Sequence, residues 1–435
     1  MNNSFYFIQL VMKVIVTHEG KQHVNAVLTG LSKFGVLVRF YTSFCANNAK
    51  LSKYLPGTLQ SKLQKRYFKD MDSSKIIHHP LIFGITSILR KEYWNVKFAY
   101  RWYDNWVARN LVSEDYDILI GYENANLASF RAAKRSHKIT VLDLAGVHHH
   151  FQNPVLTGIG TYKANKKHEL DYITRRKESA FEFTDYVIAL STFAEQTVIG
   201  SGFPADRIYK AYLGIHQTVF KPKSHYRHQE QTGMDKNAPL ELYFVGLMSL
   251  RKGLPFAVGI VEKLHRRGLN IRLTLIGPID DFDPSEIEKP WLRYIPFLNH
   301  SELVELHHSL DLFIFPSNID SWAQVVIEAM ACGSPILVSE NTGAKDAVVQ
   351  GGGMVLPVGD EVAWMKAIEA FYDDRSLLET MGKKAATIGR RYTWEAYHDQ
   401  IMKALTDIHQ KEKNRETQSK STYYPDDLVP SYYQL

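Results

Sequence analysis

The feature that most constrains this chain is a regular alternation of short apolar runs with polar turns and helical patterns. Apolar runs of about 4–8 residues are typical of strands buried on both faces, and helices between them predict parallel βαβ units. The predicted strands are Val14–Thr17, Val36–Tyr41, Ile118–Gly121, Thr140–Leu144, Tyr186–Leu190, Ile208–Ala211, Leu240–Val245, Ile271–Ile276, Leu312–Phe315, Ile336–Ser339 and Met354–Leu356, with a further strand near Tyr294.

The predicted strands fall into two sets, and the polar, apolar-poor stretch 221–238 between them predicts an interdomain linker. The expected fold is therefore α/β, with two doubly wound parallel-sheet (Rossmann-like) domains that face a central cleft. The predicted boundaries are 1–220 for the first domain, 239–388 for the second, 389–410 for a C-terminal helix that crosses back to the first domain, and 411–435 for a loosely held tail.

Composition excludes several other classes of protein. Over 435 residues, 45% apolar and 23% charged residues are ordinary for a globular enzyme and exclude a disordered, collagenous or coiled-coil chain. The two cysteines, Cys45 and Cys332, form no disulfide framework and favour a reducing compartment. Because no basic residue precedes the apolar stretch 5–16, we interpret 12–16 as a first strand and 1–11 as an extension. The predicted location is the cytoplasm.

The stretch 60–110 is basic and aromatic. It holds ten Lys and Arg residues against four acids, a difference of +6, which equals the net charge of the whole chain. Interleaved basic and aromatic residues favour an anionic lipid surface, so the protein is expected to be peripheral on the inner face of the membrane. Nucleic acid is the alternative anionic partner, which we do not expect, and a partly buried helical pair with a solvated basic face is the structural alternative. The residues expected at the lipid surface are Lys62, Lys65, Arg66, Lys69, Tyr67, Phe68, Trp94, Trp102 and Trp106.

The loop after Leu312–Phe315 is the most informative part of the sequence, because ligands of doubly wound sheets bind beyond the carboxyl ends of the strands. Asp320 stands at the predicted start of a helix, and Glu328 lies eight residues further on, about 12 Å along a helix. On spacing alone, an N-cap aspartate and an exposed helical glutamate would look the same. The N–H groups expected at the helix start, where a diphosphate would bind, are those of Ser321, Trp322 and Ala323.

The same stretch resembles the signature of the retaining glycosyltransferases of family 4 (group 1), which have the GT-B fold. That signature has two acids separated by seven residues and continues Glu-Ala-Met-Ala-Cys-Gly-x-Pro; here the first acid is Asp320, and 328–335 reads EAMACGSP. The first acid is Asp in place of the usual Glu, and Ser321 replaces a Gly. The resemblance implies that Glu328 binds the ribose of a nucleotide sugar and that Asp320 binds the donor sugar.

A second motif follows the first strand of the second domain. The residues 245–253 read VGLMSLRKG and resemble the family's turn in which a Lys and an Arg neutralise the donor diphosphate. Many members carry the Arg directly after the first glycine, Gly246; Leu247 stands there, so Arg251 is the predicted substitute, beside Lys252. A cation is also needed on physical grounds, because a departing diphosphate gains negative charge.

Further site residues follow from the resemblance. After the strand Thr140–Leu144, the family places a histidine against the donor sugar and the acceptor; His148 is the predicted residue, with His149 as the alternative. No metal is predicted at 148–150, since neighbouring residues rarely converge on one ion. Gly20 is expected to let backbone approach the donor, and backbone at Pro296 and Phe297 to cradle the base.

The resemblance implies a transferase that moves a sugar from a UDP- or GDP-linked donor to an acceptor hydroxyl without metal or other cofactor. The expected acceptor is a surface polysaccharide or a lipid-linked saccharide. His148, Asp320 and Lys252 are the predicted catalytic residues. Three alternatives stay open: a GT-A transferase with a metal at Asp281 and Asp283, a nucleotide-sugar epimerase of the GT-B fold, and a non-catalytic, membrane-docked partner of another transferase.

Overall fold

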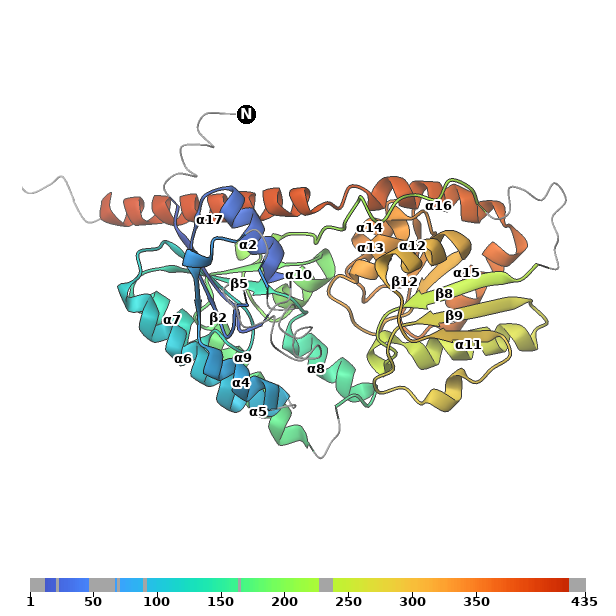
Figure 1. Ribbon diagram of the computed structural model, residues 1–435, viewed down its shortest axis with the longest axis horizontal. Coiled ribbons are helices and arrows are strands. Elements are labelled where there is room, and N and C mark those ends of the chain that lie inside the picture. The colour runs from blue at the N-terminus through green and yellow to red at the C-terminus, as the bar shows by residue number, and fades with distance from the viewer. Residues whose placement is uncertain are drawn as a thin grey trace, which may run out of the picture. The chain divides into compact units, whose positions relative to one another are not determined.

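The computed structural model describes residues 12–20, 23–46, 67–68, 71–88, 92–162, 166–226 and 238–421 (Figure 1). Strands and helices alternate through most of these ranges, as the sequence predicts. The strands form two separate sheets, in which neighbouring strands pair in parallel. The prediction of two doubly wound α/β domains is therefore confirmed.

The first sheet has seven strands in the order β3-β2-β1-β4-β5-β6-β7. The order reverses between β1 and β4, which makes the sheet doubly wound. Side chains of β1, β4 and β6 are entirely buried, which explains their uninterrupted apolar sequences. The strands are β1 (Val14–Thr17), β2 (Leu37–Thr42), β3 (Ile76–His78), β4 (Ile118–Gly121), β5 (Ile139–Leu144), β6 (Tyr186–Ala189) and β7 (Ile208–Lys210).

The helices of the first half of the chain connect these strands. A π-helical turn, Asn95–Tyr100, leads into α6, and Ser191 caps the N-terminus of α10 by accepting a hydrogen bond from the Ala194 N–H at 3.0 Å. The helices are α2 (Val24–Lys33), α4 (Pro80–Ile88), α5 (Glu92–Trp94), α6 (Arg101–Asn110), α7 (Leu127–Arg135), α8 (His149–Gly158), α9 (Lys167–Phe181) and α10 (Thr192–Ile199).

The second sheet has six strands in the order β10-β9-β8-β11-β12-β13, with the reversal between β8 and β11. Strands β8, β11 and β12 lie in its middle and are buried along their whole length, whereas the edge strands β10 and β13 are half-buried. The strands are β8 (Leu240–Val245), β9 (Ile271–Ile276), β10 (Leu292–Ile295), β11 (Leu312–Phe315), β12 (Ile336–Ser339) and β13 (Gly353–Leu356).

Helices in the second half of the chain begin at recognisable caps. Asn299 and Glu302 form a capping box at the start of α12, and the Asp360 carboxylate caps α15. The helices are α11 (Leu254–Arg266), α12 (His300–Ser309), α13 (Gln324–Ala331), α14 (Lys345–Val348), α15 (Glu361–Asp373), α16 (Ser376–Gly389) and α17 (Trp394–Ser421), the long red helix of Figure 1.

Packing divides the chain into two compact units that do not coincide with the two sheets. One unit comprises Met1–Leu142, Ala180–Tyr186 and Ile401–Leu435, and the other comprises Asp143–Ser179 and Val187–Gln400. Within the predicted linker, residues 227–237 lie outside the described ranges. The two units are called the first and the second unit below.

Two predictions about elements were wrong. The short strand β3 was missed, because its sequence, Ile-Ile-His, lies between a lysine and a His-Pro pair and only one of its side chains is buried. The predicted tail begins too early, because α17 continues through residue 411 to Ser421. Ion pairs one turn apart stabilise this continuation, among them Lys411–Asp407 at 3.0 Å. Residues 422–435 lie outside the described ranges.

Candidate active site

The loops that follow β8 and β11 are joined by hydrogen bonds at the point where the strand order of the second sheet reverses. The Asn318 N–H donates to the Arg251 carbonyl oxygen at 3.0 Å, and the Asn318 amide group donates to the Leu250 carbonyl at 2.9 Å. In the opposite direction, the Arg251 guanidinium donates to the Ile319 carbonyl at 3.2 Å. These bonds place the two predicted motifs side by side, where ligands of doubly wound sheets bind.

Two glycines allow the loops to approach so closely. Gly253 has φ 71°, and a Cβ built on it would lie 1.9 Å from the Pro316 carbonyl oxygen. Gly246, directly after β8, has φ 151°, which L side chains rarely adopt. Both positions therefore require glycine, one for contact with the loop after β11 and the other for the turn itself.

Lys252 and Asp320 form an ion pair across these loops. Each side chain is only 12% exposed, so Lys252 is not the solvated surface lysine that its loop position suggests. Desolvation lowers the pKa of Lys252, and the neighbouring Arg251 acts in the same direction, whereas the Asp320 charge opposes them. For Asp320, burial raises the pKa but the Lys252 charge and hydrogen bond outweigh it, so the pKa lies below its usual value. The Lys252 ammonium also lies 4.9 Å from the centre of the Phe315 ring.

The helix after Asp320 begins later than predicted. Helix α13 starts at Gln324, because Ala323 adopts the left-handed conformation with φ 61° and ψ 68°. Asp320 accepts hydrogen bonds from the N–H groups of Trp322 at 3.1 Å and Ala323 at 2.8 Å. These two groups are therefore occupied, and the prediction that they are free at the helix N-terminus was wrong. The predicted distance of about 12 Å from Asp320 to Glu328 along a helix is wrong too, because the helix begins only at Gln324.

The loop after β12 holds Asp320 from the other side. The Asp320 N–H donates to the Asn341 carbonyl at 2.9 Å, and the Gly343 N–H donates to the Asp320 carbonyl at 2.9 Å. A Cβ on Gly343 would lie 2.0 Å from the Ser321 carbonyl oxygen. The loops after three neighbouring strands of the second sheet thus fix the backbone of Asp320.

Ser321 connects this backbone to other parts of the second unit. Its hydroxyl donates to the Ala145 carbonyl at 2.7 Å, and its own carbonyl accepts from the Ser191 hydroxyl at 2.7 Å. Trp322 is buried and packs against the rings of Tyr212 and Tyr392, at 5.2 and 5.3 Å between centroids. The contact with Ala145 has no signal in the sequence, because nothing local indicates a bond across 176 residues.

Glu328 lies on α13 and is half-buried. Desolvation raises the pKa of its carboxyl group to about 7. No hydrogen bond or ion pair to the Glu328 side chain is found within the described ranges. A half-charged carboxyl group that is kept from water is costly to the fold and is a feature of functional sites. The alternative of an exposed helical glutamate is therefore wrong.

The histidines at 148–150 lie at the start of α8. His148 is buried and caps this helix, with its Nδ1 accepting from the His150 N–H at 3.3 Å. Burial lowers the pKa of His148 to about 4 and that of His149 to about 3. Both imidazoles are therefore neutral at pH 7. His148 belongs to the same unit as Lys252, Asp320 and Glu328. It lies three residues after Ala145, whose carbonyl accepts the hydrogen bond from Ser321.

The remaining predicted donor-binding residues lie at carboxyl ends of strands. Pro296 and Phe297 follow β10, and the Phe297 ring is 77% exposed. Gly20 follows β1 in the first unit, where its N–H donates to His18 Nδ1 at 2.7 Å. The parts predicted for all three residues in donor binding stay predictions.

The two carboxylates of the alternative metal site accept hydrogen bonds from backbone N–H groups. Asp281 accepts a hydrogen bond from the Leu250 N–H at 2.8 Å, and Asp283 caps a short 3-10 helix by accepting from the Ser285 N–H at 2.9 Å. Phe282 between them is buried. The two parallel sheets also disagree with a single GT-A domain, so that alternative was wrong.

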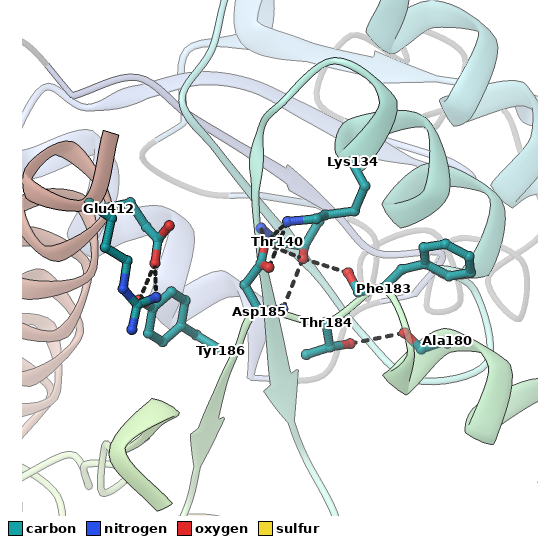
Figure 2. A network of polar contacts seen from close by, with 9 residues as sticks. Lys134, Thr140, Ala180, Phe183, Thr184, Asp185, Tyr186 and Glu412 are labelled. Atoms are coloured by element: carbon teal, nitrogen blue, oxygen red, sulfur yellow. Dashed lines mark hydrogen bonds and ion pairs between the residues drawn. The ribbon is translucent and has the colours of Figure 1, made fainter. Parts of the chain in front are cut away.

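A second lysine–aspartate pair lies in the first unit, at the opposite ends of strands (Figure 2). Asp185, directly before β6, accepts from Lys134 Nζ at 2.6 and 2.8 Å and from the Thr140 N–H at 2.9 Å. Beside it, the Tyr186 hydroxyl donates to Glu412 of α17 at 2.5 Å. These groups lie at the amino-terminal ends of β5 and β6, where they tie strands and helices together.

The basic aromatic stretch is only partly described. Lys62, Lys65, Arg66 and Lys69 lie outside the described ranges, so their predicted place at a lipid surface is untested. Phe68 is buried against Phe40, at 5.1 Å between ring centroids, so its placement at a lipid surface was wrong. Large exposed apolar side chains in this stretch, with exposed fractions of 38–66%, are Tyr67, Leu81, Trp94, Phe98 and Trp102.

Comparison with known proteins matches the part of the chain that carries these loops. Residues 227–388, less than half of the chain, match the family model described as "Glycosyl transferases group 1". The chain is 28% identical over 236 residues to a D-inositol 3-phosphate glycosyltransferase of Arthrobacter sp. (strain FB24), covering 51% of this chain and 56% of the relative. It is also 28% identical over 165 residues to the capsular polysaccharide biosynthesis glycosyltransferase CapM of Staphylococcus aureus, covering 37% and 42%. The chain thus spans about half the length of the curated relatives it matches.

Solved structures resemble the chain over most of its length. The Anabaena protein Alr3699/HepE in complex with UDP aligns with a TM-score of 0.59 at 14% identity, covering 91% of this chain and all of that one. The same protein in complex with UDP-glucose aligns with a TM-score of 0.57. The fold is GT-B. At this identity the likeness establishes the fold alone. Within the described ranges of the GT-B chain, no helix is both long and apolar enough to cross a membrane.

Proposed function

We propose that the chain is a retaining glycosyltransferase of family 4 that moves a sugar from a nucleotide diphosphate donor to an acceptor hydroxyl. The observation that carries the proposal is the joining of the β8 and β11 loops, which brings Arg251, Lys252 and Asp320 together on the segment that matches group 1 glycosyl transferases. The HepE complexes with UDP and UDP-glucose support a UDP-linked donor, and GDP is the alternative.

In the proposed reaction, Lys252 and Arg251 stabilise the departing diphosphate. The bond between the sugar and the diphosphate breaks, and the diphosphate keeps the electron pair, so negative charge develops where these cations lie. The Asp320 carboxylate holds the Lys252 ammonium in place and opposes the lowering of its pKa by burial. Asp320 is also proposed to contact the donor sugar, as the resemblance implies.

Glu328 is the proposed ribose ligand. An ionised carboxylate accepts hydrogen bonds from the two hydroxyls of a ribose, and these bonds replace the water that burial removes. Ribose binding therefore favours the ionised form of a group whose pKa is about 7 in the free protein. Phe297 offers an exposed ring that a base can stack on, and the neutral His148 is proposed to orient the sugar and the acceptor.

The decisive experiment uses purified full-length protein and a panel of UDP- and GDP-linked sugars. A true donor raises the melting temperature, because it binds the native state, and it releases nucleoside diphosphate when an acceptor is present. A changed sugar without transfer would identify an epimerase instead. Binding without turnover, in the presence of saccharide acceptors, would favour the non-catalytic partner.

The reaction is proposed to need no metal, because Arg251 and Lys252 supply the positive charge. Activity should therefore persist in EDTA. Loss of activity in EDTA that manganese restores would contradict this part of the proposal without affecting the transfer itself.

The proposed acceptor is a growing surface polysaccharide or a lipid-linked saccharide, which the similarity to CapM supports. For a lipid-linked acceptor, the exposed rings of Trp94, Phe98 and Trp102 would insert at an anionic interface, with Lys97 and Arg101 between them. Each basic residue near such a surface contributes about 1 kcal/mol. The protein should co-sediment with anionic liposomes at low salt and be released at high salt. No sedimentation at low salt would favour a soluble acceptor.

A further inference from the structure

Two histidines of α8 and a glutamate of α9 converge in the second unit. The potential ligand atoms of His149, His150 and Glu178 all lie within 4.8 Å of one another. Within the described ranges this is the only group of three or more His, Cys, Asp or Glu residues that meets such a criterion. The convergence was not expected from the sequence, because adjacent helical side chains usually diverge.

The two helices that carry these residues are fixed in register by a neighbouring bond. The Asn153 amide group of α8 donates to the Thr174 hydroxyl of α9 at 2.9 Å. On α8, Asn153 lies one turn after the two histidines. On α9, Glu178 lies one turn after Thr174. The bond between Asn153 and Thr174 therefore aligns the two helices so that the three side chains meet. The start of α8 is held as well, since the His148 N–H donates to the Thr197 hydroxyl at 3.0 Å.

The separations are close to those in a metal site. His150 Nε2 lies 3.0 Å from Glu178 Oε1. Two ligands of a tetrahedral zinc ion, each bonded at about 2.0–2.1 Å, lie about 3.3 Å apart. Rotation of a side chain would close the longest separation. His149 is buried, whereas the His150 and Glu178 side chains are 53% and 46% exposed, so an ion can enter from solvent.

We propose that His149, His150 and Glu178 form a binding site for a divalent transition metal, of which zinc is the best example, that ties α8 to α9. Two imidazoles and one carboxylate are a ligand set that zinc uses in proteins, with the fourth position left to water. Lys177 lies close enough to act on His149 and opposes a cation, so binding of only moderate strength is expected.

The proposed ligands include none of the residues that the proposed transfer reaction uses, although the His149 ring lies 4.1 Å from the His148 ring, between centroids. Binding can be tested without any substrate. Untagged, metal-free, full-length protein is titrated with Zn²⁺ by calorimetry and with Co²⁺ by visible absorption. We expect one ion per chain, visible bands typical of four-coordinate Co²⁺, and a higher melting temperature with Zn²⁺, because the ion joins two helices of the native state.

Variants decide whether these residues hold the ion. His150→Ala and Glu178→Gln should each weaken Zn²⁺ binding about tenfold or more, while His168→Ala and Glu169→Gln, at other positions of α9, should leave it unchanged. Failure of the parent protein to bind one Zn²⁺ would overturn the proposal. Equal affinity in parent, His150→Ala and Glu178→Gln would overturn it too, as would equal weakening in the control variants. None of these outcomes depends on whether the chain transfers sugars.

Discussion

Among the described residues, the ion pairs Lys252–Asp320 and Lys134–Asp185 have the same chemistry and differ in place. Lys252 and Asp320 lie at the carboxyl ends of β8 and β11, whereas Lys134 and Asp185 lie near the amino-terminal ends of β5 and β6. Exposed fractions are 12% for both partners of the first pair and 40% and 22% for those of the second. Burial of charge therefore costs more free energy in Lys252–Asp320, the pair located where doubly wound sheets bind ligands.

The partners of the two aspartates explain the difference. Asp185 accepts from a strand N–H, a threonine hydroxyl and Lys134, and so connects elements that must pack for the sheet to form. Asp320 accepts from two N–H groups of its own loop and from Lys252, and so fixes a loop and a cation. We therefore expect Lys134–Asp185 to stabilise the fold, and we propose that Lys252–Asp320 belongs to the donor site. Substitutions at Lys252, Glu328, Asp185 and Ala323 test this difference.

The largest effect is expected for Lys252→Ala. It should lower kcat/KM for sugar transfer by the equivalent of about 2–4 kcal/mol, because the departing diphosphate loses a cation. Steady-state kinetics is the measurement. Lys134→Ala is the matched control and should leave kcat/KM of the folded protein unchanged. Equal loss of activity in both variants, or full activity in Lys252→Ala, would contradict different roles for the two ion pairs.

The next effect concerns stability and pH at Glu328. An acid whose pKa rises from 4.5 unfolded to about 7 folded makes the native state less stable as pH rises through that window, and the full cost remains above it. Glu328→Gln should thus stabilise the protein at pH 8 by up to about 3 kcal/mol and flatten the pH dependence between 4.5 and 7. Denaturant unfolding at several pH values measures this.

The same variant should bind UDP or GDP more weakly, because an amide replaces the ionised acceptor. Calorimetry checks the affinity. A variant that is no more stable at pH 8, with unchanged nucleotide affinity, would show that Glu328 is an ordinary helical carboxylate.

A smaller effect is expected for Asp185→Asn in the first unit. The variant loses the Lys134 pair and keeps part of the bonding to Thr140, which should lower the free energy of unfolding by about 1–2 kcal/mol. Activity per folded molecule should not change. Denaturant unfolding with parallel kinetics tests both statements, and a loss of kcat/KM at full stability would remove the distinction between the two pairs.

The smallest effect is expected for Ala323→Gly. An alanine in the left-handed conformation destabilises the native state by about 1–2 kcal/mol. A glycine at this position removes that strain, but it loses more conformational entropy on folding, which offsets about half of the gain. The net result should be a gain of about 0.5 kcal/mol in the free energy of unfolding. Destabilisation by the glycine would show that the loops after β11 and β12 hold Ala323 without strain.

Much of the fold was predictable because its signal is local. Apolar runs gave most strands to within one residue, and β3 escaped because an edge strand with lysine and histidine beside it carries little apolar signal. The end of α17 was misplaced since helical pairs such as Lys411–Asp407 stabilise a polar helix that hydrophobic spacing does not reveal. The motifs predicted Lys252, Asp320 and Glu328 as site residues, and their roles stay predictions. The structure places Lys252 and Asp320 in the loops that follow β8 and β11, and Glu328 on α13.

By itself the sequence determined the alternation of strands and helices, hence two parallel sheets and the loops in which to look for a site. Tertiary structure alone decided the state of each side chain there. The Asp320 carboxylate faces Lys252 and its own loop, Glu328 is kept from water, and Glu178 lies beside His150. The physical reason is that strand and helix patterns arise from neighbours in the sequence, whereas desolvation and hydrogen-bond partners come from segments tens to hundreds of residues away.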